Sequence, residues 1–257
     1  MTEPYNHCLR TMERWYPVLE RTVPPPKKVP YLNHFVFRYE ERTLEQALIL
    51  KLARVVTGLH SARILIGHGF LQEQAAIHRM LDEFQQDITF LSMAPLTKDF
   101  TPLHQEYLDS FYQEEFDKPE DPVASTQKRS MVPRRKILAY LSRKQAEIGV
   151  EDPSRGQELT RTLSKAYSGF VHGAATQILN MYGGDPPRFH ISGMIGTSHQ
   201  LDHYRDHWNY LYRGIMSFNE VALVLEQSTI AEESYRYAVE FQRSAGKNYL
   251  LPEQKET

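Results

Sequence analysis

The sequence predicts an all-α protein, an irregular bundle of about six to seven helices with an extended N-terminal arm. Apolar side chains recur at intervals of three and four residues through most of the chain, which is the period of one helix face. The alternation of apolar and polar residues that marks a half-buried strand is nearly absent, so we expect no β-sheet. The expected divisions are an arm over 1–42, a single helical domain over 43–246 and a flexible tail over 247–257.

Length and composition limit the class of protein. A chain of 257 residues can bury one core without disulfides, and its only cysteine, Cys8, cannot form an internal bridge. The first residues lack the apolar segment of a signal peptide, and no apolar run approaches the roughly 18 residues that span a bilayer. A net charge of -2 implies no bulk attraction to nucleic acid or to an anionic membrane. We therefore expect a cytoplasmic protein without a membrane segment.

Seven segments carry the helical period, and proline or glycine separates most of them. Thr43 suits the N-cap of the first, and Thr197 with Gln200 has the spacing of a capping box. The first two segments should form an antiparallel hairpin across the glycines at 67 and 69. Prolines over 24–30 give the arm an extended path. The expected helices cover residues 43–66, 70–94, 102–116, 133–144, 156–182, 197–227 and 229–243, with a loop over 117–130.

Two stretches carry a resemblance to a known family. Residues 69–83, GFLQEQAAIHRMLDE, present Gly, Glu, Ala, Arg and Glu in this order on the second expected helix. Residues 167–173, YSGFVHG, pair Ser168 with His172. Both resemble a bacterial family of helical domains of unknown function that is distantly similar to the HEPN nucleotide-binding bundles. The resemblance implies an all-helical bundle, compatible with a homodimer, and a link to bacterial stress or defence.

The same resemblance implies no established reaction. Active HEPN ribonucleases carry an arginine shortly before their histidine. The matching positions before His172 are Ala166, Tyr167 and Ser168, so this chain departs from the ribonuclease pattern.

The expected helix over 156–182 offers one candidate site. At about 100° per residue, Arg161, Lys165, Ser168 and His172 share the face opposite the apolar one. Two cations beside a Ser and a His could hold a phosphate or another small anionic ligand. His172 could act as a catalytic proton donor or acceptor, because an unperturbed imidazole titrates at about 6.5. The alternative is a solvated face with His172 packed against a neighbouring helix.

The second expected helix carries charged candidates. Arg79 and Glu83 lie one turn apart and can form an ion pair or contribute to a ligand site. Glu73 falls within the apolar arc, where an unpaired carboxylate would be costly, so we expect a partner such as Arg54 or Arg63.

A histidine ladder is the candidate metal site. His199, His203 and His207 follow each other at four-residue spacing. Two histidines at i and i+4 can share one divalent metal, and a third two turns along is too far, since each turn rises about 5.4 Å. We expect His203 and His207, or alternatively His199, to need a carboxylate from elsewhere. The alternatives are a polar helix flank and a pH-sensitive interface. No other cofactor is indicated.

Two further segments carry weaker signals. Residues 192–198, SGMIGTS, could present backbone N–H groups to an anion but lack the phosphate-loop lysine, which favours a capped connector. A basic cluster spans the end of the loop over 117–130 and the start of the next expected helix, and its helical members could contact RNA or DNA. Without interleaved aromatics the default is a solvated surface. The cluster comprises Lys128, Arg129, Arg134, Arg135 and Lys136.

Three functional hypotheses follow, and the sequence does not decide whether the protein is an enzyme. The leading one is a HEPN-like helical protein that binds a protein partner or a small anionic ligand. The second is a metal-dependent or acid–base phosphoester hydrolase that uses His203 with His207, or His172. The third is nucleic-acid binding through Arg134, Arg135 and Lys136.

Overall fold

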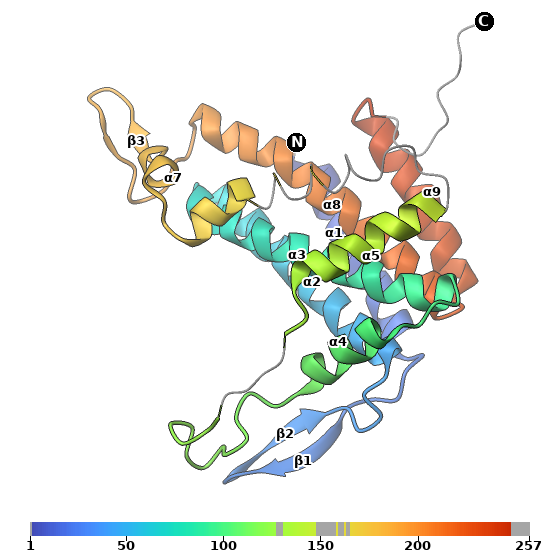
Figure 1. Cartoon of the computed structure of the whole chain (residues 1–257). Helices are drawn as coiled ribbons and strands as arrows, with labels where there is room; N and C mark the ends of the chain where they lie inside the picture. The colour runs from blue at the N-terminus through green and yellow to red at the C-terminus, as the bar shows by residue number, and fades with distance from the viewer. Residues whose placement is uncertain (1, 127–130, 148–157, 159–161, 163–164, 248–257) are drawn as a thin grey trace, which may run out of the picture.

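The computed structural model describes residues 2–126, 131–147, 158, 162 and 165–247 (Figure 1). Its described part is mainly helical, which confirms the predicted class, and includes eight helices whose bounds are given below, a further helical stretch that ends at Val171, and two small two-stranded sheets. The expectation of no sheet is wrong for these two hairpins. The Cys8 side chain is buried and forms no disulfide.

Three long helices form the centre of the fold. They are α2 (Leu44–Gly67), α3 (Leu71–Leu96) and α8 (Ser198–Val224). Helices α2 and α3 form the expected antiparallel hairpin, and Gly58 allows their close approach, because a Cβ there would lie 2.8 Å from Leu81 Cδ2. The predicted N-cap of α2 is confirmed, and Thr43 also forms a capping box with Gln46 that was not predicted, in which each side chain accepts from the other residue's backbone N–H.

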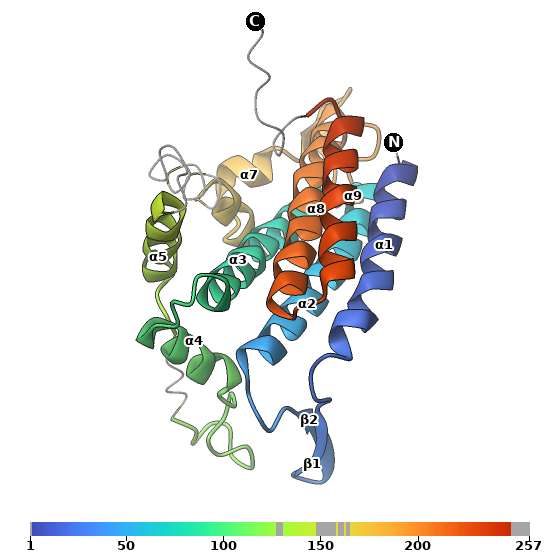
Figure 2. The same cartoon turned by 90° about the vertical axis from the view of Figure 1, so that its right-hand side faces the viewer.

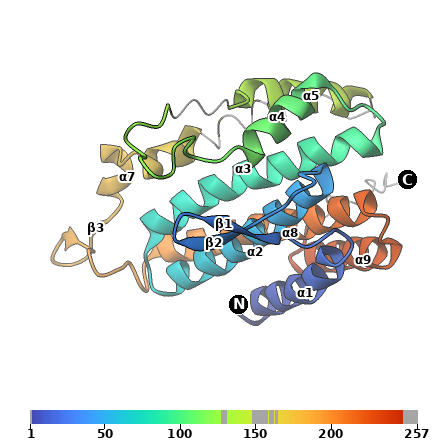
Figure 3. The ribbon, with the colours of Figure 1, turned by 90° about the horizontal axis from the view of Figure 1, so that it is seen from below.

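The other helices cover this centre on two sides (Figures 2 and 3). Helices α1 (Thr2–Glu20) and α9 (Ser228–Ser244) pack on the α8 side. Helices α4 (Pro102–Tyr112) and α5 (Arg134–Glu147) lie on the α3 side. The largest fully buried side chains include Trp15, Phe90 and Phe218, which come from three different elements.

Residues 2–20 contradict the predicted extended arm, because they form α1. Leu9, Met12, Trp15 and Leu19 recur at three- and four-residue spacing and are all buried. The prolines within residues 24–30 follow this helix and favour extended backbone only there. There the chain forms a hairpin of β1 (Lys27–Tyr31) and β2 (His34–Arg38).

The predicted long helix over 156–182 is also wrong. Part of it lies outside the described residues, and the described helix ends at Val171. Gly173 then takes a φ of 62°, a left-handed conformation that ends a helix. A short helix, α7 (Ala175–Leu179), and a hairpin of β3 (Tyr182–Gly183) and β4 (Arg188–Phe189) follow and project from the bundle (Figure 1).

Two glycines attach this projecting segment to the turn between α2 and α3. The Met194 N–H donates to the Gly69 carbonyl at 2.8 Å. Gly69 and Gly193 both have positive φ, and a Cβ on Gly193 would lie 2.4 Å from the His68 carbonyl oxygen. The backbones can therefore meet only because both positions lack a side chain.

Candidate ligand-binding site

A cavity of about 290 Å³ lies between α3, α5 and α8. Its volume is close to the lower end for small-molecule pockets, about 300 Å³. Polar residues line most of it, and three apolar side chains complete the wall. The lining residues are Gln85, Gln86 and Thr89 from α3, Leu138, Leu141, Ser142 and Gln145 from α5, and Arg213, Met216, Ser217 and Glu220 from α8.

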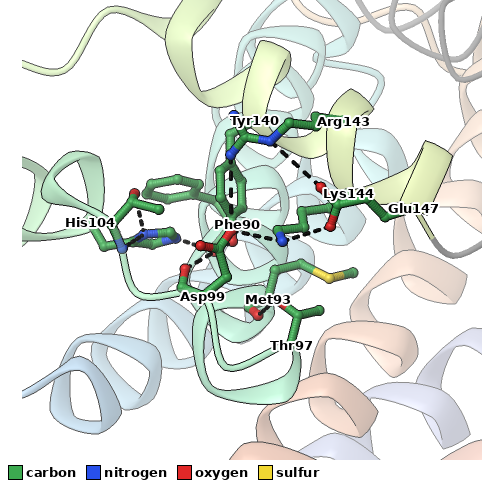
Figure 4. Close-up of polar contacts among 10 residues, drawn as sticks. Phe90, Met93, Thr97, Asp99, His104, Tyr140, Arg143, Lys144 and Glu147 are labelled. Atoms are coloured by element: carbon green, nitrogen blue, oxygen red, sulfur yellow. Dashed lines mark hydrogen bonds and ion pairs between the residues drawn. The ribbon is translucent and has the colours of Figure 1, made fainter.

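Helix α5 forms one wall of the cavity and is held near both ends. Near its start, Arg134 pairs with the buried carboxylate of Asp87. Near its end, Lys144 Nζ lies 2.7 Å from an Asp99 carboxylate oxygen, and the Tyr140 hydroxyl donates to the Asp99 carbonyl at 3.3 Å (Figure 4). These contacts fix the position of the α5 wall.

A buried histidine completes this attachment (Figure 4). His104 Nδ1 accepts from the Thr101 N–H at 3.1 Å, so its Nε2 carries the hydrogen and donates to the Phe90 carbonyl at 3.2 Å. Burial lowers the pKa of His104, which agrees with a neutral ring. The ring stacks on Phe90 at 4.2 Å between centroids and meets Tyr140 edge-on. Through these contacts, His104 connects the start of α4 with α3 and with α5.

Gln85 gives the cavity an unused acceptor. Its side chain is buried, at 4% exposure, and its Nε2 donates to the Tyr210 carbonyl at 3.1 Å. The amide orientation is therefore fixed, and Gln85 Oε1 has no hydrogen-bond partner among the described residues. A buried polar atom without a partner costs about 1–3 kcal/mol. A donor on a bound molecule would remove this cost.

Glu220 is the ionisable group with the largest consequence for the cavity. Its Oε2 accepts from the Thr89 hydroxyl at 2.9 Å. Burial raises the pKa of Glu220 to about 7, against the opposing effects of the Thr89 hydrogen bond and the Arg213 charge. The carboxyl therefore changes charge near neutral pH, a property that is frequent in functional sites.

Arg213 is the second ionisable residue of the lining, and its charge is balanced. Its Nη1 lies 2.5 Å from Asp82 Oδ1, and the Tyr210 hydroxyl donates to the other oxygen of Asp82 at 3.3 Å. The Asp82 side chain is buried. The Glu220 charge has no comparably close cation among the described ion pairs.

The pKa of Glu220 predicts a pH-dependent stability. The folded state favours the neutral carboxyl, whereas the pKa of a glutamate side chain in the unfolded protein is about 4.5. This stabilisation is complete below about pH 4.5 and is lost as the pH rises to about 7. Relative to Glu220→Gln, wild-type protein should lose on the order of 1–3 kcal/mol of unfolding free energy over this window, measured by urea denaturation. A constant difference between the two proteins would contradict the raised pKa.

A chain of hydrogen-bonded side chains continues along α3 and α8. Gln74 Nε2 donates to His78 Nδ1 at 2.6 Å, so His78 Nε2 carries a hydrogen and donates to His207 Nδ1 at 3.0 Å. His203 Nδ1 donates to Gln74 Oε1. Burial lowers the pKa of His78, and that of His207 to about 3, so both rings are neutral. His207 Nε2 is buried without a partner in the described part of the chain.

The histidine ladder is thus divided between different partners. His203 bonds to Gln74, His207 bonds to His78, and His199 is exposed. Over residues 2–126, 131–147, 158, 162 and 165–247, no group of three His, Cys, Asp or Glu side chains has the arrangement of a metal site.

The expected site around His172 is not part of the cavity. Arg161 lies outside the described residues, Lys165 and His172 are exposed, and Ser168 is half-buried. The neighbouring Tyr167 makes the contacts instead. Its ring meets His78 edge-on at 6.1 Å, and its hydroxyl donates to Asp206 Oδ2 at 3.2 Å.

The charged candidates of the second expected helix have structural partners. Arg79 pairs with Glu83 at 2.7 Å, as expected. Glu73 is exposed, so its predicted burial is wrong, and the adjacent Gln74 is the polar residue that is buried. Adjacent residues of a helix point about 100° apart, which is enough to move a side chain from the interface to solvent.

The basic cluster is not a continuous exposed surface. Arg134 is half-buried on Asp87 and Glu83, Arg135 is exposed, and Lys136 Nζ lies 3.5 Å from Glu106. Lys128 and Arg129 lie outside the described residues. Arg134 therefore has a structural role at the start of α5.

Gln85, Thr89 and Glu220 were not predicted as site residues, although the sequence carries a signal for them. Polar residues recur on α3 at spacings of three and four, and a matching series recurs on α8. These two series face each other and form what we term the polar seam. The seam comprises Gln74, His78, Asp82, Gln85 and Thr89 on α3, and His203, His207, Tyr210, Arg213, Ser217 and Glu220 on α8.

The helices of the described residues include none that is long and apolar enough to cross a membrane. Comparison with protein-family models, with curated proteins and with solved structures gave no match. The cavity at the end of the polar seam, which brings Gln85 and Glu220 together, is our candidate site within the described residues.

Proposed function

We propose that this is a ligand-binding helical protein and that its ligand occupies the cavity between α3, α5 and α8. The observation that carries the proposal is a cavity whose lining residues include Glu220, with an ionisable carboxyl, and Gln85, whose buried Oε1 has no partner among the described residues. The Gln85 hydrogen bond to Tyr210 already fixes the amide. A ligand that donates to Oε1 would therefore gain a hydrogen bond without first ordering the side chain.

The attachment of α5 supports a preformed site. Arg134 and Lys144 hold the two ends of the helix, and Leu141 between them faces the cavity. A site that exists before the ligand arrives loses little conformational entropy on binding. A buried Gln85 and a half-buried Glu220 beside a cavity are difficult to explain by packing alone, because apolar residues would fill the space at lower cost.

A ligand-binding role agrees with the leading hypothesis from the sequence, but the proposed site differs from the one expected around His172. The residues that line the cavity do not include His172, Ser168 or Lys165. The HEPN-like resemblance, the homodimer and the link to stress or defence stay predictions.

A cavity-filling variant tests the proposal. Ser142→Phe places a ring in the cavity from a half-buried position on α5, whereas Ala139→Phe adds the same ring to an exposed position that does not line it. A library of small polar fragments is screened by ligand-observed NMR against each protein. We expect a set of fragments that bind wild type and Ala139→Phe but not Ser142→Phe.

A second filling variant guards against a folding defect. Gln145→Phe acts from another half-buried lining position, and circular dichroism checks the helix content of every variant. If both filling variants fold and bind the same fragments as wild type, or if wild type binds none, the cavity is not a ligand site.

A further inference from the structure

We propose that the cavity takes a small organic cation, an ammonium group that carries a short alkyl chain. This inference rests on the proposed function and names the chemical class of its ligand. It follows from three properties of the lining, namely its acceptors, its charges and its apolar wall.

Two polar groups of the lining residues have unused acceptor capacity. Gln85 Oε1 is buried without a partner in the described structure, and its Nε2 is used by the Tyr210 carbonyl. The Glu220 carboxylate accepts from the Thr89 hydroxyl and retains further lone pairs. A molecule that satisfies both must present N–H or O–H donors, and an ammonium group presents three.

The charges of the lining favour a cation over an anion. The ionisable residues that line the cavity are Arg213 and Glu220, both on α8, while the lining residues of α3 and α5 carry no charge. Arg213 is paired with the buried Asp82. A bound cation would lie near the Glu220 carboxylate, which has no such close ion-pair partner. A bound anion would be repelled by that carboxylate, and Arg213 is already paired with Asp82.

The apolar side of the cavity favours an organic cation over a metal ion. Leu138, Leu141 and Met216 form a wall that a hydrocarbon chain can cover. A metal would need several charged or imidazole ligands, and no such group of three exists in the described residues. The volume of about 290 Å³ accommodates an alkyl chain of a few carbons.

Three probes of equal chain length separate charge from shape. Titration calorimetry at about pH 8 compares n-pentylamine, 1-pentanol and sodium pentanoate, which differ in the charge of one end group. We expect the amine to bind at least about tenfold more tightly than the alcohol or the acid, because only the amine gains both the charge and the donors.

Variants of the two acceptors identify the contact. Glu220→Gln should reduce the affinity for n-pentylamine about tenfold and leave that for 1-pentanol unchanged, whereas Glu232→Gln, at an exposed position on α9, should change neither. Gln85→Met, a second and independent variant, should also weaken the amine selectively.

The pH dependence gives a further readout. The amine stays charged between about pH 6 and pH 8, while the Glu220 carboxyl, with its pKa raised to about 7, gains its charge over this range. Arg213 is the charged lining group that faces it from α8, and Thr89 is its partner from α3. Amine affinity should therefore increase with pH in wild type and stay constant in Glu220→Gln.

The outcomes distinguish the ligand class from the site. Tighter binding of pentanol or pentanoate that Ser142→Phe abolishes would refute the cation and keep the cavity. Binding of the amine that is insensitive to Glu220→Gln and Gln85→Met would also overturn the inference. If none of the three probes binds at millimolar concentration while fragments still bind the cavity, the class is wrong and the site stands.

Discussion

Replacing Asp87 with alanine is expected to lower the free energy of unfolding by about 3–5 kcal/mol, because it leaves two cations without their shared carboxylate. Asp87 is 2% exposed. One of its oxygens lies 2.7 Å from Lys51 Nζ, and the other contacts Arg134. Lys51 is buried and cannot easily reach solvent, so its charge would lose its principal stabilisation.

The surroundings of Lys51 explain why this loss should be large. Burial lowers the pKa of Lys51, and the Asp87 charge opposes that effect. The Lys51 ammonium lies 4.9 Å from the ring centroids of both Phe84 and Phe111. In Asp87→Ala, these cation–π contacts would be the main interactions that still stabilise the buried charge. Cation–π contacts contribute about 0.5–2 kcal/mol each, which is less than the buried ion pair.

Urea denaturation at neutral pH measures the effect. Glu106→Ala removes the partner of Lys136, an exposed pair at 3.5 Å, and should cost less than about 1 kcal/mol. The double variant Lys51→Met with Asp87→Leu removes the buried pair together and should recover much of the stability. A loss below about 1 kcal/mol for Asp87→Ala would show that the cluster is solvated.

Replacing Gly193 with alanine should detach the projecting segment from the turn between α2 and α3. Gly193 has a φ of 104°, which is unfavourable for alanine, and the added Cβ would lie 2.4 Å from the His68 carbonyl oxygen. Backbone strain of this kind costs about 1–3 kcal/mol before the clash is counted. We expect a local loss of at least about 2 kcal/mol.

Amide hydrogen exchange reports this local loss. The Met194 N–H is bonded to the Gly69 carbonyl at 2.8 Å and should exchange at least about 30-fold faster in Gly193→Ala. Gly183→Ala is the matched control, because no atom lies within 4 Å of its added Cβ. Equal Met194 exchange in both variants would mean that the segment is not held by this contact.

The central hairpin was predictable because its apolar pattern is strong and its ends are marked. Leu48 and Leu81 are fully buried as expected, and Thr43 caps α2. Helix α1 was missed because the prolines after it suggested an extended arm, although Met12 and Trp15 already had helical spacing. A proline restricts its own backbone and that of the residue before it, so it gives no information about the structure ten positions earlier.

The helix over 156–182 was overextended for a related reason. Gly173 sits within an otherwise helical pattern, and an isolated glycine there costs only about 1 kcal/mol, so it predicts no definite end. The end depends on the left-handed conformation of Gly173, which lets the Ala174 N–H donate to the Gly169 carbonyl at 2.9 Å. The hairpin that follows could not be recognised from strands of two residues.

The candidate site was less predictable than the fold. A polar series such as His78, Asp82 and Gln85 has the same spacing on a solvated face as on a buried one. Its burial depends on α8 as the neighbour of α3, and the intervening 97–197 segment does not specify that pairing. The raised pKa of Glu220 likewise arises from burial, which no spacing reveals.

Helices α3 and α8 run in the same direction, since contacts ascend together from Gln74 with His203 to Thr89 with Glu220. The chain must therefore travel back along the bundle before α8 can begin. Helix α5, which supplies one wall of the cavity, belongs to this return path and not to the central packing of α2, α3 and α8. Ile137, Tyr140 and Leu141 of α5 belong to the common core, whereas Ser142 and Gln145 are half-buried cavity residues outside it. Under the proposed function, substitutions at Ser142 and Gln145 should therefore change ligand preference at a smaller cost in stability than substitutions at the three core positions.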